Sequence, residues 1–393
     1  MNTQSWQVKA TLLLVSSLTI MSMITISASL PDMTRSFAHI PNSEGLVKLS
    51  LSFPGLFIAL SAIVAGIIID RTGRLKLLGI ALVLYAIGGT SGYWLKDLYG
   101  ILAGRALLGI SVGISMTIVT TLVADYYQGK SRQQFAGLQI AVMSLAGILF
   151  ITLGGFLADI GWRVPFLLYF FSLLILPAAY LHLKEPKRER EASEPVKGIR
   201  SPRIIWLIFA NVMLMWIIFF IIPVQIPFYL KEIGIEKNAM IGVAIAASTL
   251  FSAVSSFSYS RIRDMLGFRQ IFALGYFLMA LAFVSIAFGN SYAMVLLGML
   301  LAGFGMGLMI PNANLWVMHL APQEVRGKEI GRLTTFWFLG QFLSPLVLLP
   351  FLKFLTLSRL FYILAIILFG LTLIFVIWYW LNPRPPDPPQ SKN

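Results

Sequence analysis

Twelve long apolar segments separated by short polar joints constrain the fold of this chain more than any other feature. They fall at about 10–31, 46–69, 75–95, 98–124, 135–158, 164–183, 204–228, 239–262, 268–288, 292–318, 331–352 and 359–381. Each has about the 20 residues that a helix needs to cross a lipid bilayer. A helix satisfies its own backbone hydrogen bonds in lipid, so we expect every crossing to be helical. The sequence therefore predicts an all-α membrane protein with twelve transmembrane helices.

Composition and charge narrow the class further. The 393 residues are 58% hydrophobic and only 12% charged, which excludes a soluble globular protein, and the lack of cysteine excludes a disulfide framework. A formal net charge of +14 raises the question of nucleic-acid binding, but most of the 30 Lys and Arg residues lie in joints on one side. That asymmetry identifies the cytoplasmic side. We expect both termini in the cytoplasm, a bacterial inner (cell) membrane, and no nucleic-acid partner.

The chain divides into two similar halves. A charged, proline-containing joint at 184–203 is interpreted as a cytoplasmic linker between the half at 1–183 and the half at 204–381, and 382–393 as a disordered tail. A shift of 194 residues superposes four separate regions, for example Gly109 on Gly303. Each half has an even number of crossings, so we predict two parallel six-helix repeats about an axis along the membrane normal.

The strongest local motif is GIIIDRTGRLK at 66–76, in the joint after the second crossing. A glycine at position 66 permits close approach of a neighbouring helix, and Asp70 can cap a helix or pair with a cation. We predict that a cytoplasmic gate is formed by Gly66, Asp70, Arg71, Gly73, Arg74, Asp125, Arg132, Asp264 and Arg326. The alternative is that these basic residues only set the orientation in the membrane.

This loop resembles the G-x-x-x-D-[RK]-x-G-R-[RK]-[RK] signature of the major facilitator superfamily of secondary transporters, from which Leu75 departs. The segment YGILAGRALLGISVG at 99–113 is similar to the fourth-helix motif of that family, with Arg105 and Gly109 matching. The resemblance implies the major facilitator fold and a gating role for the loop. Drug:proton antiporters of the family also carry G-P-x-x-G-G in the fifth helix, of which this chain has only the final pair, at 154–155.

Arg105 is the basic residue that lies well inside a predicted crossing and not near its end. A charge in the membrane is costly and marks a functional site by default, so we expect Arg105 to face a substrate charge or to take part in proton coupling. The alternative is a structural bond to backbone carbonyls of the first or fifth crossing. None of the 16 acidic residues falls in the middle of a crossing, so coupling would have to run through Asp32, Asp70 or Asp125 at the edges.

Polar and aromatic residues deep in the crossings are candidates for a substrate cavity, which the resemblance places between the two halves. The residues that we expect there are Ser22, Thr25, Gln139, Asn211, Trp216, Gln225, Asn312, Asn314, Trp337 and Gln341. The alternative for each is a bond between helices. Aromatic walls, amides and one cation suit an amphipathic or weakly anionic organic molecule. Small residues at every fourth position of 244–260 predict close contact between the eighth crossing and the other half.

We therefore expect a secondary active transporter that moves a small organic molecule by alternating access, with proton-coupled efflux as the first hypothesis. The alternative is an importer or uniporter of a metabolite. A membrane-embedded enzyme is a remote third hypothesis, because the sequence has neither clustered metal-ligating residues nor a phosphate-binding loop. We accordingly expect no catalytic residues, no cofactor and no metal. The expected partners are the substrate, protons in the antiport case, and membrane lipid around a monomer.

Overall fold

The computed structural model describes residues 5–186 and 201–381, apart from the side chains of residues 67, 70 and 71. Most of the predicted linker and the whole predicted tail therefore lie outside the described residues. Helices make up the described part of the chain. They are α1 (Trp6–Ile24), η1 (Ser27–Ser29), α2 (Leu30–Ser36), α3 (Ser43–Thr72), α4 (Arg74–Trp94), α5 (Leu98–Tyr126), α6 (Gly129–Ile160), η2 (Val164–Phe170), α7 (Phe171–His182), α8 (Ile204–Phe219), α9 (Ile221–Glu232), α10 (Asn238–Met265), α11 (Phe268–Phe288), α12 (Tyr292–Leu320), α13 (Arg326–Leu352) and α14 (Leu357–Leu381).

These elements form twelve apolar spans, which confirms the predicted number of crossings. Two crossings are interrupted near their middle, a feature that we did not predict. The first is divided into α1, η1 and α2, and the seventh into α8 and α9. Each break lies a few residues before a proline, Pro31 or Pro223, whose missing N–H and fixed ring disfavour an uninterrupted helix.

Contacts inside the halves repeat with the same spacing as the sequence. Gly109 in α5 lies against the backbone oxygen of Pro54 in α3, and Gly303 in α12 lies against that of Ser248 in α10. Both members of the first pair are shifted by 194 residues to give the second pair. The same shift relates Gly104, which faces the oxygen of Gly88, to the equivalent contact of α12 with α11. The repeat is therefore present as packing geometry and not only as a sequence pattern.

The small-residue face of α10 packs within its own half. The backbone oxygen of Ser252 lies against Gly307 in α12, and the hydroxyl of Ser256 donates to the Gly307 oxygen at 2.7 Å. The prediction that this face meets the other half is therefore wrong. Another face of α10 makes that contact, since an added Cβ on Gly242 would lie 2.8 Å from the oxygen of Ile151 in α6.

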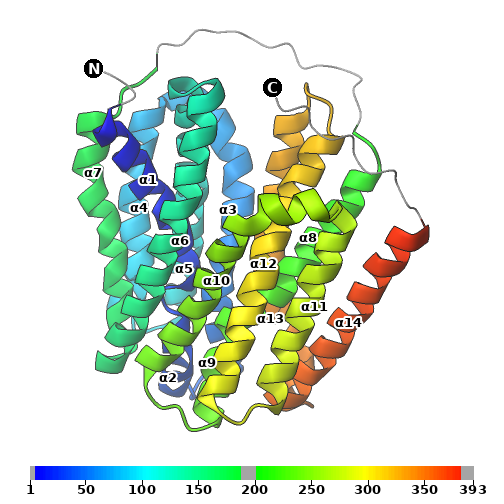
Figure 1. The fold of residues 1–393 in the computed structure, drawn as a ribbon. Helices are drawn as coiled ribbons and strands as arrows, with labels where there is room; N and C mark the ends of the chain where they lie inside the picture. The colour runs from blue at the N-terminus through cyan, green and yellow to red at the C-terminus, as the bar shows by residue number, and fades with distance from the viewer. Residues whose placement is uncertain (1–4, 187–200, 382–393) are drawn as a thin grey trace.

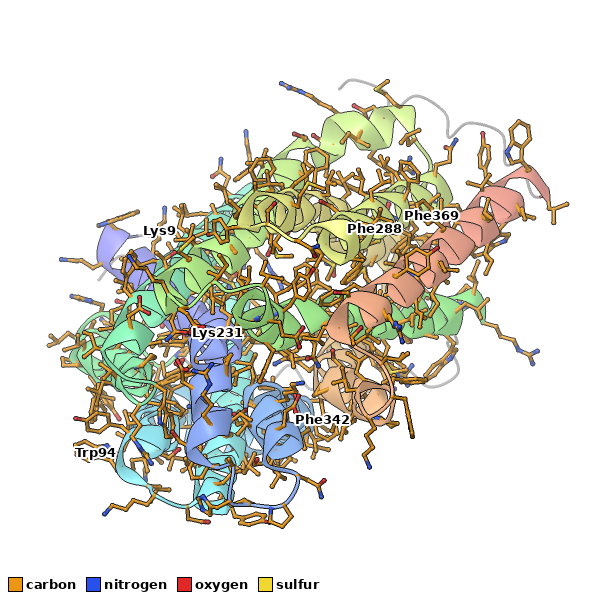
Figure 2. All side chains as sticks on the ribbon, turned by 90° about the horizontal axis from the view of Figure 1, so that it is seen from below. Lys9, Trp94, Lys231, Phe288, Phe342 and Phe369 are labelled. Carbon is orange, nitrogen blue, oxygen red and sulfur yellow. The ribbon has the colours of Figure 1, made fainter. Side chains whose placement is uncertain are left out.

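The halves meet mainly through α6 with α10 and α3 with α13. We call the end of the bundle with the α3–α4 joint the linker face, because the chain enters and leaves the linker there, and the other end the opposite face. The ribbons of α6 and α10 approach each other at the opposite face, which is the lower end of Figure 1, and diverge toward the linker face. In Figure 2, which looks onto the opposite face, Lys231 lies between the two halves and Phe342 lies between α3 and α13.

Glycines show how the separation of the halves changes along the bundle. At the opposite face, Gly155 lies against Gly242 and would place a Cβ 2.7 Å from the oxygen of Asn238. Toward the linker face, a Cβ added to Gly66, Gly137 or Gly331 would meet no atom within 4 Å. These glycines belong to α3, α6 and α13, three of the four helices that join the halves at the opposite face. The bundle is therefore closed at the opposite face and open at the linker face.

Candidate transport site and gates

An aromatic pair lies near the middle of the bundle, where α8 and α13 touch. The rings of Trp216 and Trp337 are 5.9 Å apart between centroids, at 31°. Gly340 makes this possible, because a Cβ there would lie 2.6 Å from the oxygen of Met213 and 2.8 Å from the Cβ of Trp216. The structure thus brings together two of the residues that we predicted to line the cavity, through a glycine contact that we did not predict.

Several polar atoms near this pair have no partner. The indole N–H groups of Trp216 and Trp337 are buried without one, and so are both amide atoms of Gln341, whose side chain is fully buried. Gln341 lies at the contact between the halves, since a Cβ on Gly55 of α3 would come within 3.2 Å of its Cδ. A buried polar group without a hydrogen bond is costly. These atoms are therefore candidates for contact with a bound molecule or water.

Gln225 in α9 shares this property. Both atoms of its amide are buried without a partner, as is the hydroxyl of Ser29. Its helix contacts η1 of the other half, where the hydroxyl of Ser27 donates to the backbone oxygen of Pro223. Gln225 therefore remains a candidate for the substrate cavity, and Ser29 in the first crossing becomes a further candidate.

The other candidates of the N-terminal half are bonded within that half. Ser22 and Thr25 are buried and donate to their own helix, to the oxygens of Thr19 at 2.7 Å and Met21 at 2.6 Å. Gln139 in α6 donates to the hydroxyl of Ser16 in α1 at 2.8 Å. Such bonds are the alternative that we gave for each residue, and they leave these three side chains with satisfied donors.

The asparagines of the C-terminal half are also bonded within their half, although the amide nitrogen of Asn211 is buried without a partner. The amide oxygen of Asn211 accepts from Tyr276 at 2.8 Å, so that α8 is tied to α11. Asn312 accepts from Tyr259 at 3.2 Å and donates to the backbone of α11 at 2.9 Å. Asn314 donates to the oxygen of Ile310 in its own helix at 3.2 Å. Asn211 and Asn312 thus connect helices of one half in this conformation, whereas Asn314 bonds within α12.

Arg105 lies inside the N-terminal half. It is completely buried, and its guanidinium donates to the hydroxyl of Tyr169 and to the backbone oxygen of Gly89, each at 3.0 Å. The same group stacks on the rings of Phe166 and Tyr169, at 4.7 and 4.8 Å from their centroids. These partners belong to α4 and η2, so Arg105 joins the third, fourth and sixth crossings. In this conformation it makes the structural bond of our alternative interpretation, although with a different helix from the ones expected.

The motif loop at the linker face acts within one half. Gly73 has a φ of +84°, which favours glycine, and it ends α3 in a tight turn. Glu185, which we did not predict, accepts from the backbone N–H groups of Arg74 at 2.8 Å and Leu75 at 2.9 Å, and so caps α4. Arg74 forms an ion pair with Asp125 at the end of α5. Two predicted gate residues are thus paired, both in the N-terminal half.

The remaining predicted gate residues are not assembled. Arg132 and Asp264 are exposed, and Arg326 donates to the backbone oxygen of Ala321 at 3.4 Å, five residues earlier in its own half. The close approach predicted at Gly66 is absent in this conformation. Asp70 and Arg71 are gate residues whose side chains lie outside the described part of the structure.

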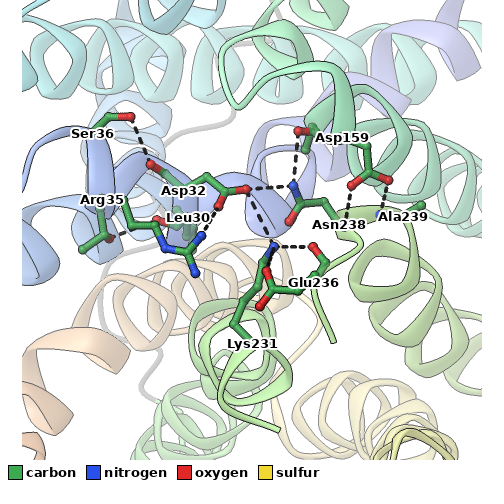
Figure 3. Close-up of polar contacts among 11 residues, drawn as sticks. Leu30, Asp32, Arg35, Ser36, Asp159, Lys231, Glu236, Asn238 and Ala239 are labelled. Carbon is green, nitrogen blue, oxygen red and sulfur yellow. Dashed lines mark hydrogen bonds and ion pairs between the residues drawn. The ribbon is translucent and has the colours of Figure 1, made fainter. Parts of the chain in front are cut away.

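A hydrogen-bonded cluster joins the halves at the opposite face (Figure 3). Asp159 at the end of α6 accepts from the backbone N–H of Asn238 at 2.6 Å and of Ala239 at 3.1 Å, so it caps α10 of the other half. The side chain of Asn238 donates to Asp32 at 2.8 Å, and Lys231 lies 4.0 Å from the same carboxylate. We call Asp32, Asp159, Lys231, Asn238 and Ala239 the latch.

A buried lysine makes a further contact between the halves. Lys48 in α3 is only 1% exposed, pairs with Glu44, and lies 4.4 Å from the ring centroid of Phe228 in α9. Because Phe228 belongs to the other half, this cation–π contact also closes the opposite face.

The N-terminal half has a further anchor at this face. Arg163, between α6 and η2, donates to the backbone oxygens of Gly92 at 2.7 Å and Leu95 at 2.6 Å and stacks on Trp162. Burial lowers the pKa of Arg163 from its usual value. An arginine starts so far above neutrality that the guanidinium stays charged and keeps both bonds.

The latch residues had weak sequence signals. Asp159 comes four residues after the glycine pair at 154–155, and Asn238 stands directly before a predicted crossing. Capping residues are normally sought within one helix. Here the carboxylate and the helix that it caps are 79 residues apart, so no local pattern links them.

The geometry agrees with the comparisons to known proteins. A sequence model of the Major Facilitator Superfamily matches residues 12–241 and 236–393. The chain is 26% identical to the bacillibactin exporter of Bacillus subtilis (strain 168), over 72% of this chain and 75% of that protein. It is also 26% identical to a putative proline/betaine transporter of Staphylococcus aureus (strain COL), over 68% and 65% of the two chains.

A crystal structure of a D-xylose-proton symporter superposes with a TM-score of 0.75, covering 94% of this chain and 97% of the symporter at 16% identity. That similarity shows the fold. The comparisons confirm the expectation of a transporter rather than an enzyme, and of a multi-pass integral membrane protein. With both halves matched by the family model, the chain belongs to the major facilitator superfamily.

Proposed function

We propose that this transporter exports a small organic molecule through a site between its two halves, and that proton uptake drives the export. The observation that carries the proposal is the central set of unpartnered polar atoms at Trp216, Trp337 and Gln341, in a bundle closed at one face and open at the other. The similarity to a bacillibactin exporter supports the direction.

Alternating access then requires the halves to exchange their contacts. With the linker face in the cytoplasm, as the distribution of basic residues indicates, the conformation described above is open inward. In the outward-open state the latch separates and the linker face closes. The predicted gate residues Arg132, Asp264 and Arg326 are free to meet the other half at that step, and Gly66 then has a neighbour.

Asp32 is our candidate for the proton-coupling group. Its carboxylate holds Asn238 and Lys231 of the other half when the opposite face is closed and loses them when that face opens. This role fits a chain without a carboxylate in the middle of its crossings.

Arg105 acts in this proposal as a positioning residue. By holding α4, α5 and η2 together it keeps the N-terminal half rigid as it moves. Replacing Arg105 by Ala removes its bonds to Gly89 and Tyr169 and its packing on Phe166, and we expect it to lower both folded yield and transport. Wild-type thermal stability in Arg105→Ala, with transport lost, would instead favour direct contact with the substrate.

The experiment that tests the function uses a deletion strain and an overexpressing strain, grown against a panel of toxic compounds and secreted metabolites. Export predicts that overexpression protects and deletion sensitises for at least one compound. Proteoliposomes with a pH-sensitive dye then test coupling: the transported compound moves protons in the wild type and not in Asp32→Asn. Transport with no proton movement in the wild type removes the antiport claim.

A metabolite importer is the second candidate. The missing Gly-Pro of the antiporter motif, where Phe150 and Ile151 stand, favours it, as does the similarity to a putative proline/betaine transporter. Uptake of labelled compounds in the same two strains separates the candidates, since an importer makes the overexpressing strain accumulate more and not less.

A further inference from the structure

The middle of the bundle contains buried hydrogen-bond donors that have no acceptor within the protein. The indole N–H groups of Trp216 and Trp337 point to no acceptor, and the Gln341 amide has neither of its bonds. Indole can only donate, whereas an amide both donates and accepts. A molecule that fills this site therefore has to offer mainly acceptor oxygens or nitrogens, with at least one donor for the Gln341 oxygen.

The shape of the site is set by rings. Trp216 and Trp337 present tilted aromatic surfaces 5.9 Å apart between centroids. On the side of the N-terminal half, α3 lies close to α13 at Gly55. A Cβ added to Gly55 would lie 2.9 Å from the backbone oxygen of Phe338. Aromatic faces favour a flat aromatic guest, because offset or edge contacts between rings add to the burial of apolar surface.

The scarcity of charged residues around the site limits the net charge that a bound molecule can carry. The sequence has no Asp, Glu, Lys or Arg throughout α8, between Arg332 and the end of α13, or between Lys48 and Asp70 of α3. Arg105 is turned into its own half and bonded there. Lys48 is seven residues from Gly55, about 10 Å along the helix, and is paired with Glu44.

We propose that the substrate is an uncharged, planar aromatic molecule with several acceptor atoms and at least one N–H or O–H donor, bound by Trp216, Trp337 and Gln341. This inference rests on the proposed transport function and replaces the weakly anionic substrate that we expected from the sequence. A net charge on the guest finds no counter-charge in the helices that form the site, and an uncompensated charge away from water is expensive.

Two matched fluorescent probes test the class. We would measure anisotropy of 7-amino-4-methylcoumarin, which is neutral, and of 7-amino-4-methylcoumarin-3-acetate, which is anionic, with the full-length protein in lipid nanodiscs. The expected result is at least tenfold tighter binding of the neutral probe. Equal or tighter binding of the anionic probe would overturn the proposal, and so would the absence of binding by both.

Variants test the residues. Trp337→Phe keeps a ring and removes only the N–H, and Gln341→Leu keeps the volume and removes the amide; each is expected to weaken the neutral probe about tenfold. Gln341→Glu adds a negative charge. We expect this variant to bind a third probe, 7-amino-4-methylcoumarin carrying a trimethylammonium group, and so to lose the preference for a neutral guest. The control is Trp94→Phe, an exposed tryptophan at the rim of the bundle (Figure 2). Unchanged affinity in all three site variants contradicts the assignment.

The inference and the proposed function fail separately. If the growth panel identifies exported compounds but neither coumarin binds, transport stands and the substrate class is wrong. If the neutral coumarin binds through Gln341 but no compound is exported or imported, the site stands and the transport proposal is wrong.

Discussion

The opposite face and the linker face are built from the same helices but are held in different ways. At the opposite face, α6 and α10 touch through Gly155 and Gly242, and a carboxylate of one half caps a helix of the other. At the linker face the equivalent stretches of α3, α6 and α13 have open space beside their glycines, and the ion pair Arg74–Asp125 stays within one half. The contacts between the halves are thus concentrated where opening has to occur in the next state.

The largest effect is expected from locking the closed face. Gly45 in α3 lies against Leu349 in α13, with 3.1 Å from an added Cβ to its Cδ2. The chain has no cysteine of its own, so Gly45→Cys with Leu349→Cys can be crosslinked without background. We expect the crosslink to stop transport completely, because the opposite face can no longer open, and a reductant to restore it.

The matched control for the lock is the pair Gly66→Cys and Gly331→Cys, at the open ends of the same two helices. It is expected to crosslink much more slowly. If the linker-face pair reacts as fast as the opposite-face pair in the substrate-free protein, the contrast between the faces is wrong.

The next effect comes from wedging the closed face. Gly155→Leu forces a side chain into the backbone of α10, where even a Cβ would lie 2.7 Å from an oxygen. Overpacking of this kind costs about 1–3 kcal/mol, so we expect transport to fall by about tenfold or more. Initial rates in everted vesicles measure it. Gly137→Ala, in the same helix but with no neighbour within 4 Å, is expected to retain nearly wild-type rates.

A smaller effect is expected from the latch. Asp159→Asn removes the charge that caps α10 and keeps the shape of the side chain. A capping or charge-assisted bond is worth about 1–2 kcal/mol, which corresponds to a roughly five- to thirty-fold shift toward the state open at the opposite face. The ratio of crosslinking rates of the two cysteine pairs reports that shift. A ratio unchanged from the wild type would show that Asp159 does not stabilise the closed face.

The smallest effect is expected at the linker face. Arg74 and Asp125 are partly exposed and belong to one half, and a surface ion pair contributes about 0–1 kcal/mol. Arg74→Ala is therefore expected to change the thermal stability in detergent little and the crosslinking ratio by less than about threefold. A shift as large as that of Asp159→Asn would mean that the motif loop already governs the conformation described here.

How far the sequence predicted the site depends on the range of each interaction. Gln341 was predicted because it is a polar residue deep in a crossing, and Trp216 and Trp337 because they are aromatic residues deep in their crossings, away from the membrane interfaces. Asn211 and Asn312 had the same sequence signal but are bonded inside their half. A polar residue in a crossing reports that it needs a partner, and not which helix supplies it.

The sequence by itself determined the twelve crossings, the repeat and the family resemblance, because lipid demands long apolar helices and the two halves preserve the same glycine contacts. Only the tertiary structure decided that Arg105 turns inward to Gly89 and Tyr169, that α10 meets the other half through Gly242 and not through its serines, and that Asp159 caps a distant helix. Each of these depends on the rotation of one helix against another. That rotation is set by packing between segments far apart in the chain, and no local pattern encodes it.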